Sequence, residues 1–294
     1  MNLSEYLAAQ TRLIDAALDR CVPSDITAPE TIHRAMRYSL FAGGKRIRPV
    51  LCITAASAVS ETASEGVEHA ACTLELIHTY SLIHDDLPAL DNDDLRRGRP
   101  TNHKVFGDAM AILAGDSLLT LAFEALARLP IDADRRVRLV QELATASGTV
   151  GGMIAGQVHD LEGEGQTPTA ELLERIHRAK TGALLRASVR MGAIYAGADA
   201  AELDALSRFG EHIGLAFQIV DDILDVEQSS EALGKTAGKD AAQHKITFPA
   251  VYGLTRSHEM AAEQQVLAHE SVNRFGDRAH WLHQLADLVV QRTA

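Results

Sequence analysis

The chain contains few of the residues that define several common protein classes. Only three of its 294 residues are cysteines, Cys21, Cys52 and Cys72, and they lie far apart and form no CxxC pair. We therefore expect neither a zinc site built on cysteine pairs nor a disulfide framework, and a reducing cytoplasm is the expected location. Aromatic residues amount to 4%, and the alternating Val, Ile and Thr runs typical of strands are scarce, which argues against a fold built on sheets.

Positive charge and long apolar runs are also in short supply. The formal net charge is −12, which argues against sequence-independent binding of nucleic acid, because such binding needs clustered cations. The same charge does not argue against anionic small substrates, since local cations and metals can reverse the field. No run of about 18 uncharged apolar residues is present, and acidic residues interrupt residues 1–20, so we expect neither a membrane span nor a secretory signal.

Helical spacing of apolar residues, in contrast, is abundant. One apolar stripe runs through residues 3–18, another through residues 172–179, and residues 213–220 are apolar on nearly all sides. Such spacing forms one face of a helix, and a helix that is apolar all round is usually buried. Residues 167–171 have the pattern of a helix start, with a threonine cap and a proline in the first turn. No linker or internal repeat divides the chain, which predicts one all-α domain over residues 1–294 with about ten or more helices.

The first candidate for chemistry is an acidic segment that follows an apolar helical run, residues 72–84. It contains, in order, Asp85, Asp86, Asp91, Asp93, Asp94, Arg96 and Arg97. So many carboxylates in a short stretch repel one another unless cations compensate, which favours a metal site. A solvated acidic turn before a basic one is the alternative, because charge runs usually face solvent.

A second acidic segment strengthens the metal interpretation. Asp221 and Asp225 are four residues apart and share one face of a helix, with Asp222 beside them. Like charges at that spacing destabilise a helix, and these follow residues 214–220, which are too apolar for an ordinary surface. Carboxylates at the end of a buried helix need a metal or a cationic partner. Salt bridges at the helix end are the alternative that remains open.

Both segments offer hard oxygen ligands, which suit Mg²⁺ bridged to substrate phosphates. Two such clusters are best placed on opposite sides of a cavity that holds a diphosphate, which requires further cations. The candidates are Lys45, Arg46, Arg48, Arg96, Arg97, Arg99, Lys180, Lys235, Lys239 and Lys245. Two of these basic residues directly follow glycine, Lys45 in Gly43-Gly44-Lys45 and Lys235 in Gly234-Lys235. Neither sequence is a P-loop, because a P-loop needs a longer glycine motif after a strand.

In chain order, these motifs resemble those of one enzyme family. They are Gly43-Gly44-Lys45-Arg46-Ile47-Arg48-Pro49, residues 84–98 (HDDLPALDNDDLRRG), Lys180-Thr181-Gly182, residues 217–225 (FQIVDDILD) and residues 234–245. The chain resembles the trans-isoprenyl diphosphate synthases, specifically the short-chain farnesyl or geranylgeranyl diphosphate synthases of bacterial and plastid type. The resemblance spans most of the chain. It implies the all-α isoprenoid synthase fold, a helical bundle around a central substrate cavity, usually as a homodimer.

The resemblance also implies a reaction and a role for individual residues. An allylic diphosphate ionises with the help of Mg²⁺, isopentenyl diphosphate attacks the cation, and loss of a proton completes a chain one isoprene unit longer. Mg²⁺ is implied to bind to Asp85, Asp86, Asp91, Asp221, Asp222 and Asp225. Contacts to the allylic diphosphate are implied for Arg96, Lys180, Thr181, Gln218, Lys235 and Lys245. Contacts to isopentenyl diphosphate are implied for Lys45, Arg48, His78 and Arg97, although a lone histidine in an apolar helix is more often structural.

Product length is implied to depend on Tyr80 and Ser81, just before the first acidic motif. Ser81 lies about one helical turn before Asp85 and Tyr80 slightly further back, so a bulky ring there favours farnesyl diphosphate. Geranylgeranyl diphosphate is the alternative, because residues 91–94 resemble geranylgeranyl-type enzymes as well, and Tyr80 could also simply pack in the core. Two other classes stay open: a terpene cyclase, which needs no isopentenyl site, and a non-catalytic subunit of a heteromeric synthase.

Overall fold

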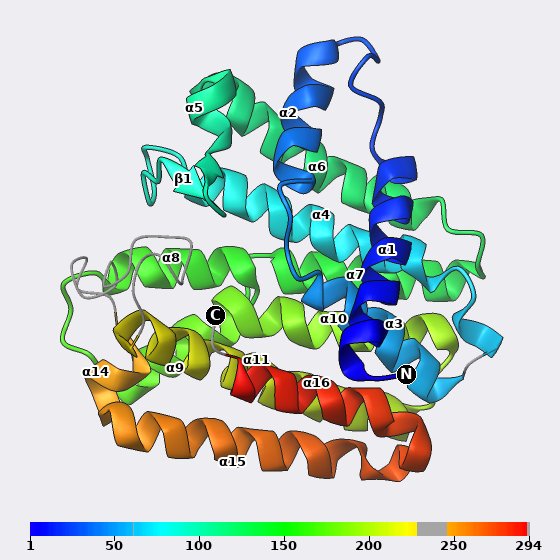
Figure 1. The fold of residues 1–294 in the computed structure, drawn as a ribbon, viewed down its shortest axis with the longest axis vertical. Coiled ribbons are helices and arrows are strands. Elements are labelled where there is room, and N and C mark those ends of the chain that lie inside the picture. Colours follow the sequence, from blue (N-terminus) through cyan, green and yellow to red (C-terminus); the bar gives the residue numbers. More distant parts are fainter. Residues whose placement is uncertain (61, 228–245, 293–294) are drawn as a thin grey trace. The chain divides into compact units, whose positions relative to one another are not determined.

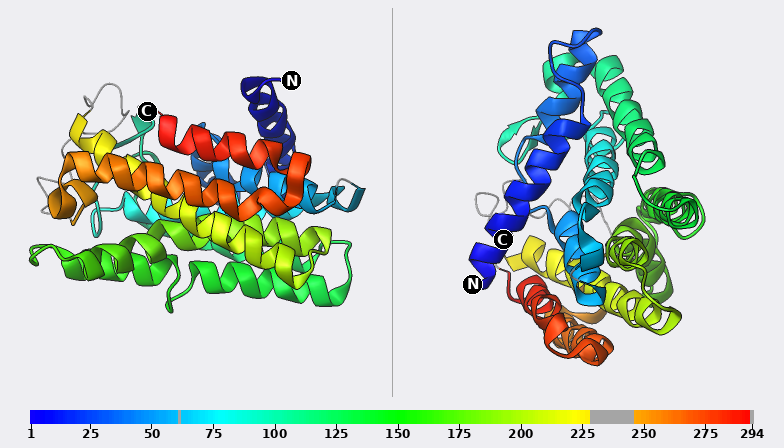
Figure 2. Two further views of the ribbon diagram at one scale, coloured as in Figure 1. Left: turned by 90° about the horizontal axis from the view of Figure 1, so that it is seen from below. Right: turned by 90° about the vertical axis from the view of Figure 1, so that its right-hand side faces the viewer.

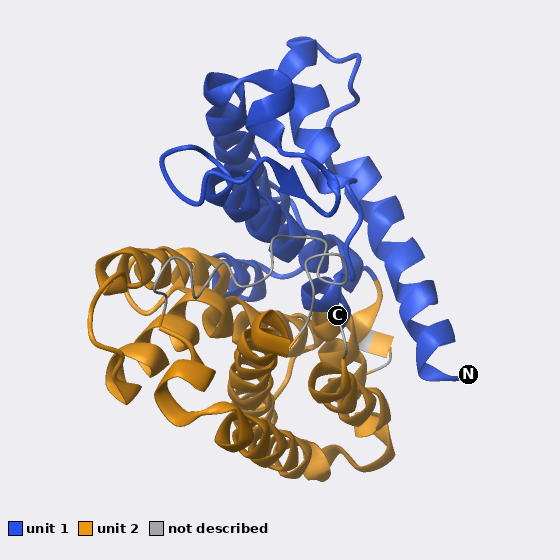
Figure 3. Ribbon diagram, turned by 60° about the vertical axis from the view of Figure 1, so that its left-hand side comes forward, with its two compact units in different colours: residues 1–50, 66–140 blue, residues 51–65, 141–294 orange. Residues whose placement is uncertain are grey.

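Helices account for nearly every regular element of the structure, as the apolar spacing predicts. The computed structural model describes residues 1–60, 62–227 and 246–292 (Figure 1). The chain divides into two compact units, residues 1–50 with 66–140 and residues 51–65 with 141–294, which Figure 3 colours separately. The predicted all-α class is confirmed, whereas the single domain over residues 1–294 stays a prediction.

The first unit is built around α4. Its elements are α1 (Leu3–Cys21), α2 (Glu30–Leu40), the start of α3 (Ile47–Val59), α4 (Val67–Asp85), β1 (Leu95–Arg96), β2 (Arg99–Pro100), α5 (Asn102–Phe106), α6 (Asp108–Ala127) and the start of α7 (Ala133–Ser147). Helix α4 packs against α1, α2 and α6, and most of its side chains are buried. A helix with neighbours on several sides has little room for a polar face, which explains why its sequence is so apolar.

Local signals set where α1 begins and which face it buries. The side chain of Asn2 accepts the backbone N–H of Glu5 at 2.9 Å, and the Glu5 carboxylate accepts the N–H of Asn2 at 3.0 Å. This capping box satisfies two of the N–H groups that a helix start leaves without partners. Ile14, Ala17 and Leu18 are buried, which confirms the apolar stripe predicted for residues 3–18.

A short hairpin interrupts the helices of the first unit. Strands β1 and β2 pair antiparallel, and Arg97 and Gly98 between them have φ of 53° and 71°. Positive φ at both central residues gives the turn that matches the twist of a two-residue hairpin. The hydroxyl of Tyr38 on α2 donates to the carbonyl of Pro100 at 2.8 Å, and the guanidinium of Arg99 lies 4.7 Å from the Tyr38 ring centre. These contacts hold the hairpin, and with it the consecutive arginines Arg96 and Arg97, against α2.

The second unit is built around the long helix α11. Its elements are the rest of α3, η1 (Thr62–Ser64), the rest of α7, α8 (Met153–Gly163), α9 (Ala170–His177), η2 (Arg178–Gly182), α10 (Ala183–Ala196), α11 (Ala200–Glu227), α14 (Phe248–Tyr252), α15 (Leu254–Val272), η3 (Asn273–Ala279) and α16 (His280–Gln291). Helix α11 packs against α10, α15 and α16, and Figure 2 shows α15 and α16 lying side by side. Ile213, Ala216 and Ile219 of α11 are buried, which confirms the buried helix predicted for residues 213–220.

The helix predicted around residues 172–179 is confirmed, but one detail of its predicted start is wrong. Helix α9 begins after Thr169, whose hydroxyl oxygen accepts the N–H of Leu172 at 3.2 Å. The threonine cap is therefore confirmed, but Pro168 precedes the helix and is not in its first turn. After His177 the chain continues as a π-helix, η2, and then as α10. Turns of π-helix are rare and are frequently found at functional sites.

One helix among the described residues, α6, is long and apolar enough to cross a membrane by length and composition alone. The mean hydropathy of its most apolar window is 1.6, and 33% of that window is buried. Core helices of ordinary proteins pass the same test, and α6 packs against α4. Its outer face carries Ile112 and Leu113, which are 44% and 52% exposed. The expected absence of a membrane span and the cytoplasmic location stay predictions.

Candidate active site

The first acidic segment forms a folded loop at the C-terminal end of α4. The backbone N–H of Asp91 donates to the carbonyl of Asp85 at 2.8 Å, and the N–H of Asp93 donates to the carbonyl of Asp86 at 3.2 Å. Asn92 between them has φ of 50°, a left-handed conformation that asparagine tolerates better than most residues. The Leu-Pro-Ala-Leu spacer is thus looped out, and the backbone of Asp91 returns to the helix end that carries Asp85.

Asp86 is the buried acid of this loop and pairs with Arg96. It is 4% exposed, and its Oδ1 accepts hydrogen bonds from Arg96 Nε at 3.0 Å and Nη2 at 2.5 Å. Burial raises the pKa of Asp86, although the hydrogen bond and charge of Arg96 act against the rise. The pKa of Arg96 is also raised, because Asp86 outweighs the lowering effect of burial. Two residues with different predicted roles, metal ligand and diphosphate contact, therefore bind each other in this structure.

The glycine motif before α3 meets the hairpin at Arg97. Nη1 of Arg97 donates to the carbonyl of Gly43. A Cβ at Gly44 would lie 2.8 Å from that same Nη1, so only glycine lets the guanidinium approach the backbone this closely. Burial lowers the pKa of Arg97. The structure therefore brings together the glycine motif and the hairpin, whose bonded residues Gly43 and Arg97 are 54 positions apart in the sequence.

Three of the residues predicted to bind isopentenyl diphosphate form one electrostatic group in the first unit. Burial lowers the pKa of His78 well below its ordinary value, and the charges of Arg48 and Arg97 lower it further. The imidazole is therefore neutral at neutral pH, and the two guanidinium groups are close enough to act on it. Lys45, the fourth predicted residue, is exposed in the turn before α3.

Arg46 corrects one part of the sequence interpretation. It was counted among the cations for a diphosphate, but it is 4% exposed and turned into the core. Its Nε donates to Asp15 at 2.9 Å and its Nη1 to Glu75 at 2.8 Å, while Nη2 donates to the carbonyl of Leu40 at 2.8 Å. Burial acts to lower the pKa of Arg46, but Glu75 and Asp15 raise it overall. A guanidinium with three internal acceptors holds α1, α2 and α4 together and is not placed for substrate.

Tyr80 is fixed in α4 close to the first acidic loop. It is 5% exposed, and its ring meets the His84 ring edge-on with 5.7 Å between centres. Burial, helped by the charge of Asp85, raises the pKa of Tyr80 to about 12. Its hydroxyl has no hydrogen-bond partner among the described residues. Ser81, the other residue predicted to set product length, donates its hydroxyl to the His78 carbonyl at 2.9 Å.

The second acidic segment is the last turn and a half of α11. Asp222 and Asp225 are 5% and 6% exposed, and Asp221 is only half-buried. Nη2 of Arg292 donates to Asp221 Oδ1 at 2.7 Å and to the carbonyl of Phe217 at 2.6 Å, and the guanidinium lies 3.8 Å from the Phe217 ring centre. The three acids predicted from the sequence therefore lie in one helix, and the most exposed of them, Asp221, forms a salt bridge with Arg292.

Asp222 is held by groups that sequence reasoning missed. Its Oδ2 accepts the backbone N–H of Phe248 at 2.9 Å and lies 3.4 Å from Nε2 of His177. Nδ1 of His177 lies 3.0 Å from Nε2 of Gln218, and the imidazole stacks on the Phe248 ring with 5.2 Å between centres. His177 stands three residues before Lys180 in an amphipathic helix. The signal that could have found it is a histidine on the apolar stripe of that helix, four residues after Leu173.

Lys180 and Thr181 lie in the π-helix η2, where the chain is closely packed. Nζ of Lys180 donates to Oδ2 of Asp160 on α8 at 2.6 Å. A Cβ at Gly156 would lie 2.1 Å from the backbone nitrogen of Lys180, so α8 and η2 touch backbone to backbone there. Asp160 was also missed, and its signal is a carboxylate on the face of α8 that carries the buried Met153 and Gly156. Lys235, Lys239 and Lys245 lie outside the described residues.

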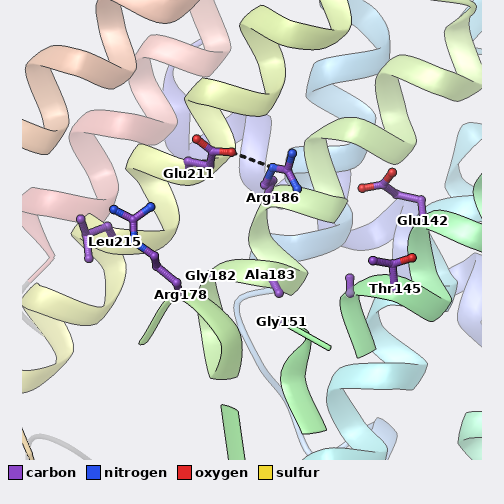
Figure 4. Close-up of a pocket in the computed structure, with 10 residues that line it drawn as sticks. Glu142, Thr145, Gly151, Arg178, Gly182, Ala183, Arg186, Glu211 and Leu215 are labelled. Carbon is purple, nitrogen blue, oxygen red and sulfur yellow. Dashed lines mark ion pairs between the residues drawn. The ribbon is translucent and has the colours of Figure 1, made fainter. Parts of the chain in front are cut away.

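A separate pocket of about 220 Å³ opens in the second unit, on the side of η2 and α10 that carries Arg178 and Arg186 (Figure 4). It is lined by Glu142, Thr145, Ala146, Gly151, Arg178, Gly182, Ala183, Arg186, Glu211 and Leu215. Nε of Arg186 lies 2.9 Å from Glu211, and Glu142 binds Arg190 at 2.6 Å. None of the predicted site residues lines this pocket, so it is distinct from the candidate active site.

Comparison with known proteins assigns the class that this fold and these residues indicate. Residues 29–281 match the polyprenyl synthetase family. The chain is 49% identical to farnesyl diphosphate synthase of Geobacillus stearothermophilus, over 89% of this chain and 88% of the relative. It is 50% identical to the large subunit 1 of a chloroplastic heterodimeric geranylgeranyl pyrophosphate synthase of Arabidopsis thaliana, over 99% and 80%. Among solved structures, an FPP/GFPP synthase of Zymomonas mobilis aligns with a TM-score of 0.85 at 36% identity, over 98% of this chain and 99% of that one.

The chain belongs to the polyprenyl synthetase family, as a short-chain trans-isoprenyl diphosphate synthase. The predicted resemblance and the isoprenoid synthase fold are confirmed, as is the class of enzyme, a trans-prenyltransferase. The relatives divide between farnesyl and geranylgeranyl synthases, so the family does not fix the product.

Proposed function

We propose that the protein condenses isopentenyl diphosphate with an allylic diphosphate, in a reaction that needs Mg²⁺, and that its main product is farnesyl diphosphate. The observation that carries the proposal is the group formed by Arg48, His78 and Arg97 beside Gly43 and Gly44. None of these three side chains is a carboxylate, and in the described part of the chain Glu75 and Asp86 act on Arg97 through their charges without forming a salt bridge with it. The two guanidinium groups therefore suit a second diphosphate that is bound without metal. A terpene cyclase ionises one diphosphate and has no use for such a group.

Mg²⁺ fits the donor chemistry of both acidic segments. Asp222 and Asp225 are buried carboxylates at the end of an apolar helix, and such groups require a cation. Mg²⁺ usually takes one or two carboxylates, keeps waters and binds substrate phosphates. A group of three or more His, Cys, Asp or Glu around one ion is therefore not required, and none occurs in the described part of the chain. Asp85 and Asp91 would hold metal on the first segment; Asp86 and Asp221, each paired with an arginine, complete the predicted set.

The protein side chains contribute binding, charge and exclusion of water to the reaction. Bound Mg²⁺ supplies Lewis-acid stabilisation of the departing diphosphate. Arg96, Lys180 and Thr181 keep their predicted role as contacts of an allylic diphosphate, and such contacts favour breaking of the allylic C–O bond. Arg48 and Arg97 would hold isopentenyl diphosphate with its double bond toward the new cation, so that a C–C bond forms and a proton is then lost. Apolar walls would keep water from trapping the cation.

Farnesyl diphosphate is proposed as the main product because of Tyr80. The ring is buried on α4, five residues before Asp85, and its contact with His84 fixes it in place. A rigid ring at that point limits the length of a chain that grows from the first acidic loop. Replacing Tyr80 by alanine is expected to shift the products from C15 toward C20 and longer. A wild type that already makes mainly the C20 product would contradict the stop role and support geranylgeranyl diphosphate synthase.

A homodimer is proposed as the working form, and the outer face of α6 supports it. Ile112 and Leu113 expose large apolar surfaces on that face, and exposed apolar patches commonly mark contacts with another protein. One of the relatives is named as a subunit of a heterodimeric enzyme. Light scattering of the purified protein separates the cases: twice the 31.7 kDa of one chain is expected. A monomer would contradict the proposal.

The decisive experiment is incubation of the purified protein with Mg²⁺, isopentenyl diphosphate and, in turn, dimethylallyl, geranyl or farnesyl diphosphate, followed by sizing of the products. We expect elongation to C15 that stops when either isopentenyl diphosphate or Mg²⁺ is left out. Turnover of the allylic substrate without isopentenyl diphosphate would support a cyclase instead. No turnover with any substrate would support a non-catalytic subunit.

A further inference from the structure

His177 is a buried polar side chain that the proposed reaction does not use. It ends α9, is 7% exposed, and lies against α11 beside Gln218 and Asp222. A buried imidazole needs hydrogen-bond partners for both nitrogens, because an unpaired polar atom in the interior destabilises the fold. The arrangement around the ring therefore indicates what the side chain does.

Gln218 determines which nitrogen of His177 carries the proton. Nε2 of Gln218 lies 3.0 Å from Nδ1 of His177, and an amide NH₂ can only donate, so Nδ1 accepts and the ring proton is on Nε2. The opposite orientation of the amide would put the proton on Nδ1 and turn the lone pair of Nε2 toward a carboxylate, which is unfavourable. The network thus favours the tautomer whose Nε2–H is directed at Asp222.

Nε2 of His177 is aimed at Asp222 from just beyond hydrogen-bond distance. It lies 3.4 Å from Oδ2 of Asp222 and has no hydrogen-bond partner among the described residues. The same Oδ2 accepts the backbone N–H of Phe248 at 2.9 Å, and the ring of Phe248 stacks on His177. The Phe248 N–H already donates to this oxygen, and a second donor from His177 would fix the rotation of the carboxylate about its axis.

We propose that His177 is a positioning residue for Asp222, and that it orients this carboxylate for Mg²⁺ through its Nε2–H while Gln218 fixes the tautomer. The inference rests on the proposed function, since it takes Asp222 as a metal ligand. Residues that orient ligating carboxylates typically change metal affinity 10–100-fold when they are replaced. Gln218 gains a role that does not require contact with the allylic substrate, because it acts on Asp222 through His177.

Three substitutions of His177 separate positioning from packing. His177→Phe keeps the stack on Phe248 and removes both nitrogens. His177→Gln places an amide N–H at about the reach of Nε2, and His177→Asn places one only at the reach of Nδ1. We expect His177→Phe and His177→Asn to behave alike and His177→Gln to restore function, whereas a purely structural role would favour the aromatic replacement.

The readout is the thermal stabilisation of the full-length protein by Mg²⁺ in the presence of inorganic diphosphate, which does not depend on turnover. In His177→Phe and His177→Asn the Mg²⁺ concentration for half of the stabilisation should rise about tenfold or more. His177→Gln should stay within about threefold of wild type. In turnover assays, the apparent Mg²⁺ constant should rise in parallel, while the KM for isopentenyl diphosphate should stay unchanged.

His212 offers a matched control on α11, the helix that carries Asp222. Its Nδ1 lies 2.8 Å from Oε1 of Gln264, so it is a half-buried His–Gln pair without a predicted metal ligand beside it. His212→Phe should leave the Mg²⁺ midpoint at the wild-type value. The inference is overturned if His177→Phe and His177→Asn keep the wild-type midpoint while Asp222→Asn raises it. If the wild type shows no Mg²⁺-dependent stabilisation at all, the proposed function fails and this inference fails with it.

Discussion

The two acidic segments have similar composition and different construction. The first is a loop closed by its own backbone hydrogen bonds, and the partner of Asp86 is Arg96, ten residues further along the chain. The second is the end of a buried helix, and the partners of its acids come from distant segments: Arg292 is 71 residues from Asp221, and His177 belongs to another helix. Local contacts thus define the first segment and tertiary contacts define the second. A change at Asp85 in the first should alter chemistry alone, whereas a change at Asp222 in the second should also alter the packing of its unit.

The largest expected effect compares Asp222→Ala with Asp85→Ala. Both remove a proposed metal ligand, so both should lower kcat by about 10³. Only Asp222→Ala also leaves the buried N–H of Phe248 without its acceptor, at about 1–3 kcal/mol, so only this variant should lower the Tm by several degrees. Steady-state kinetics and calorimetry on both proteins test the comparison. An equal loss of Tm in Asp85→Ala would show that the first segment is not local in its effects.

The next effect concerns the cationic group of the first unit. Arg97→Lys should raise the KM for isopentenyl diphosphate about tenfold, because an ammonium cannot bind two oxygens and the Gly43 carbonyl with one planar fork. The KM for the allylic substrate and the Tm should change little. Arg99→Lys is the matched control, since the Arg99 guanidinium lies over the Tyr38 ring and has no proposed contact with substrate. Equal effects of the two variants on the KM for isopentenyl diphosphate would contradict the assignment of Arg97.

A smaller effect is expected where the second segment reaches the surface. Arg292→Ala removes a guanidinium that shares Asp221, whose side chain is 43% exposed. Exposed ion pairs contribute about 0.2–1 kcal/mol, so the Mg²⁺ midpoint should fall by no more than about fivefold as the competing cation is lost. The Mg²⁺ midpoint of Arg292→Lys should lie between those of Arg292→Ala and wild type. A rise of the midpoint in Arg292→Ala would show that Arg292 assists metal binding instead of competing with it.

The smallest effect should appear in the pH dependence of stability. Nδ1 of His283 on α16 lies 2.7 Å from Nδ1 of His269 on α15, and Nε2 of His269 lies 2.8 Å from Asp287. Burial lowers the pKa of His283, and the charges of His269 and His280 add to the lowering, while Asp287 opposes it. A folded pKa below the ordinary value of about 6.5 means that the unfolded chain binds the proton more readily. The contribution of neutral His283 to the free energy of unfolding is therefore fully present above about pH 6.5 and is lost as the pH falls.

Urea unfolding at about pH 5.5 and at about pH 7.5 measures this effect on wild type and on His283→Asn. The wild type should be less stable at the lower pH, and the variant should lose part of that difference. His78 contributes in the same direction, because its pKa is also lowered, so the variant should not lose the whole slope. Identical slopes in the two proteins would contradict the assignment to His283.

The sequence predicted those features that local spacing controls. Apolar periodicity identified α1 and the buried part of α11, and the composition of each acidic segment identified both proposed metal sites. The C-terminal end of α9 was not predicted, because the π-helix that begins at Arg178 continues the chain in helical form, beside the close approach of α8. The hairpin at Arg96 was not expected either, since strands of two residues leave no periodic pattern to detect.

The direction in which a side chain points could not be predicted from the sequence. Arg46 and Arg48 are two residues apart in one motif, yet Arg46 is bonded to Asp15 and Glu75 in the core while Arg48 acts on His78. Asp160 and His177 were missed for the same reason, because the role of each depends on a partner in another helix, Lys180 for Asp160 and Asp222 for His177. The roles of Lys235 and Lys245 remain predictions, as these residues lie outside the described part of the chain.

Gly156 touches the backbone of Lys180 so closely that any side chain there would collide with it. In a saturation mutagenesis screen scored on growth, this glycine should therefore tolerate substitution as poorly as the aspartates, although it offers no functional group to a substrate. Lys180 beside it should still accept arginine in part, since a charge can be replaced by another charge. Intolerance at Gly156 would then reflect the close packing of α8 against η2 and not a catalytic role. A search for catalytic residues based on fitness alone would wrongly assign part of the site to α8.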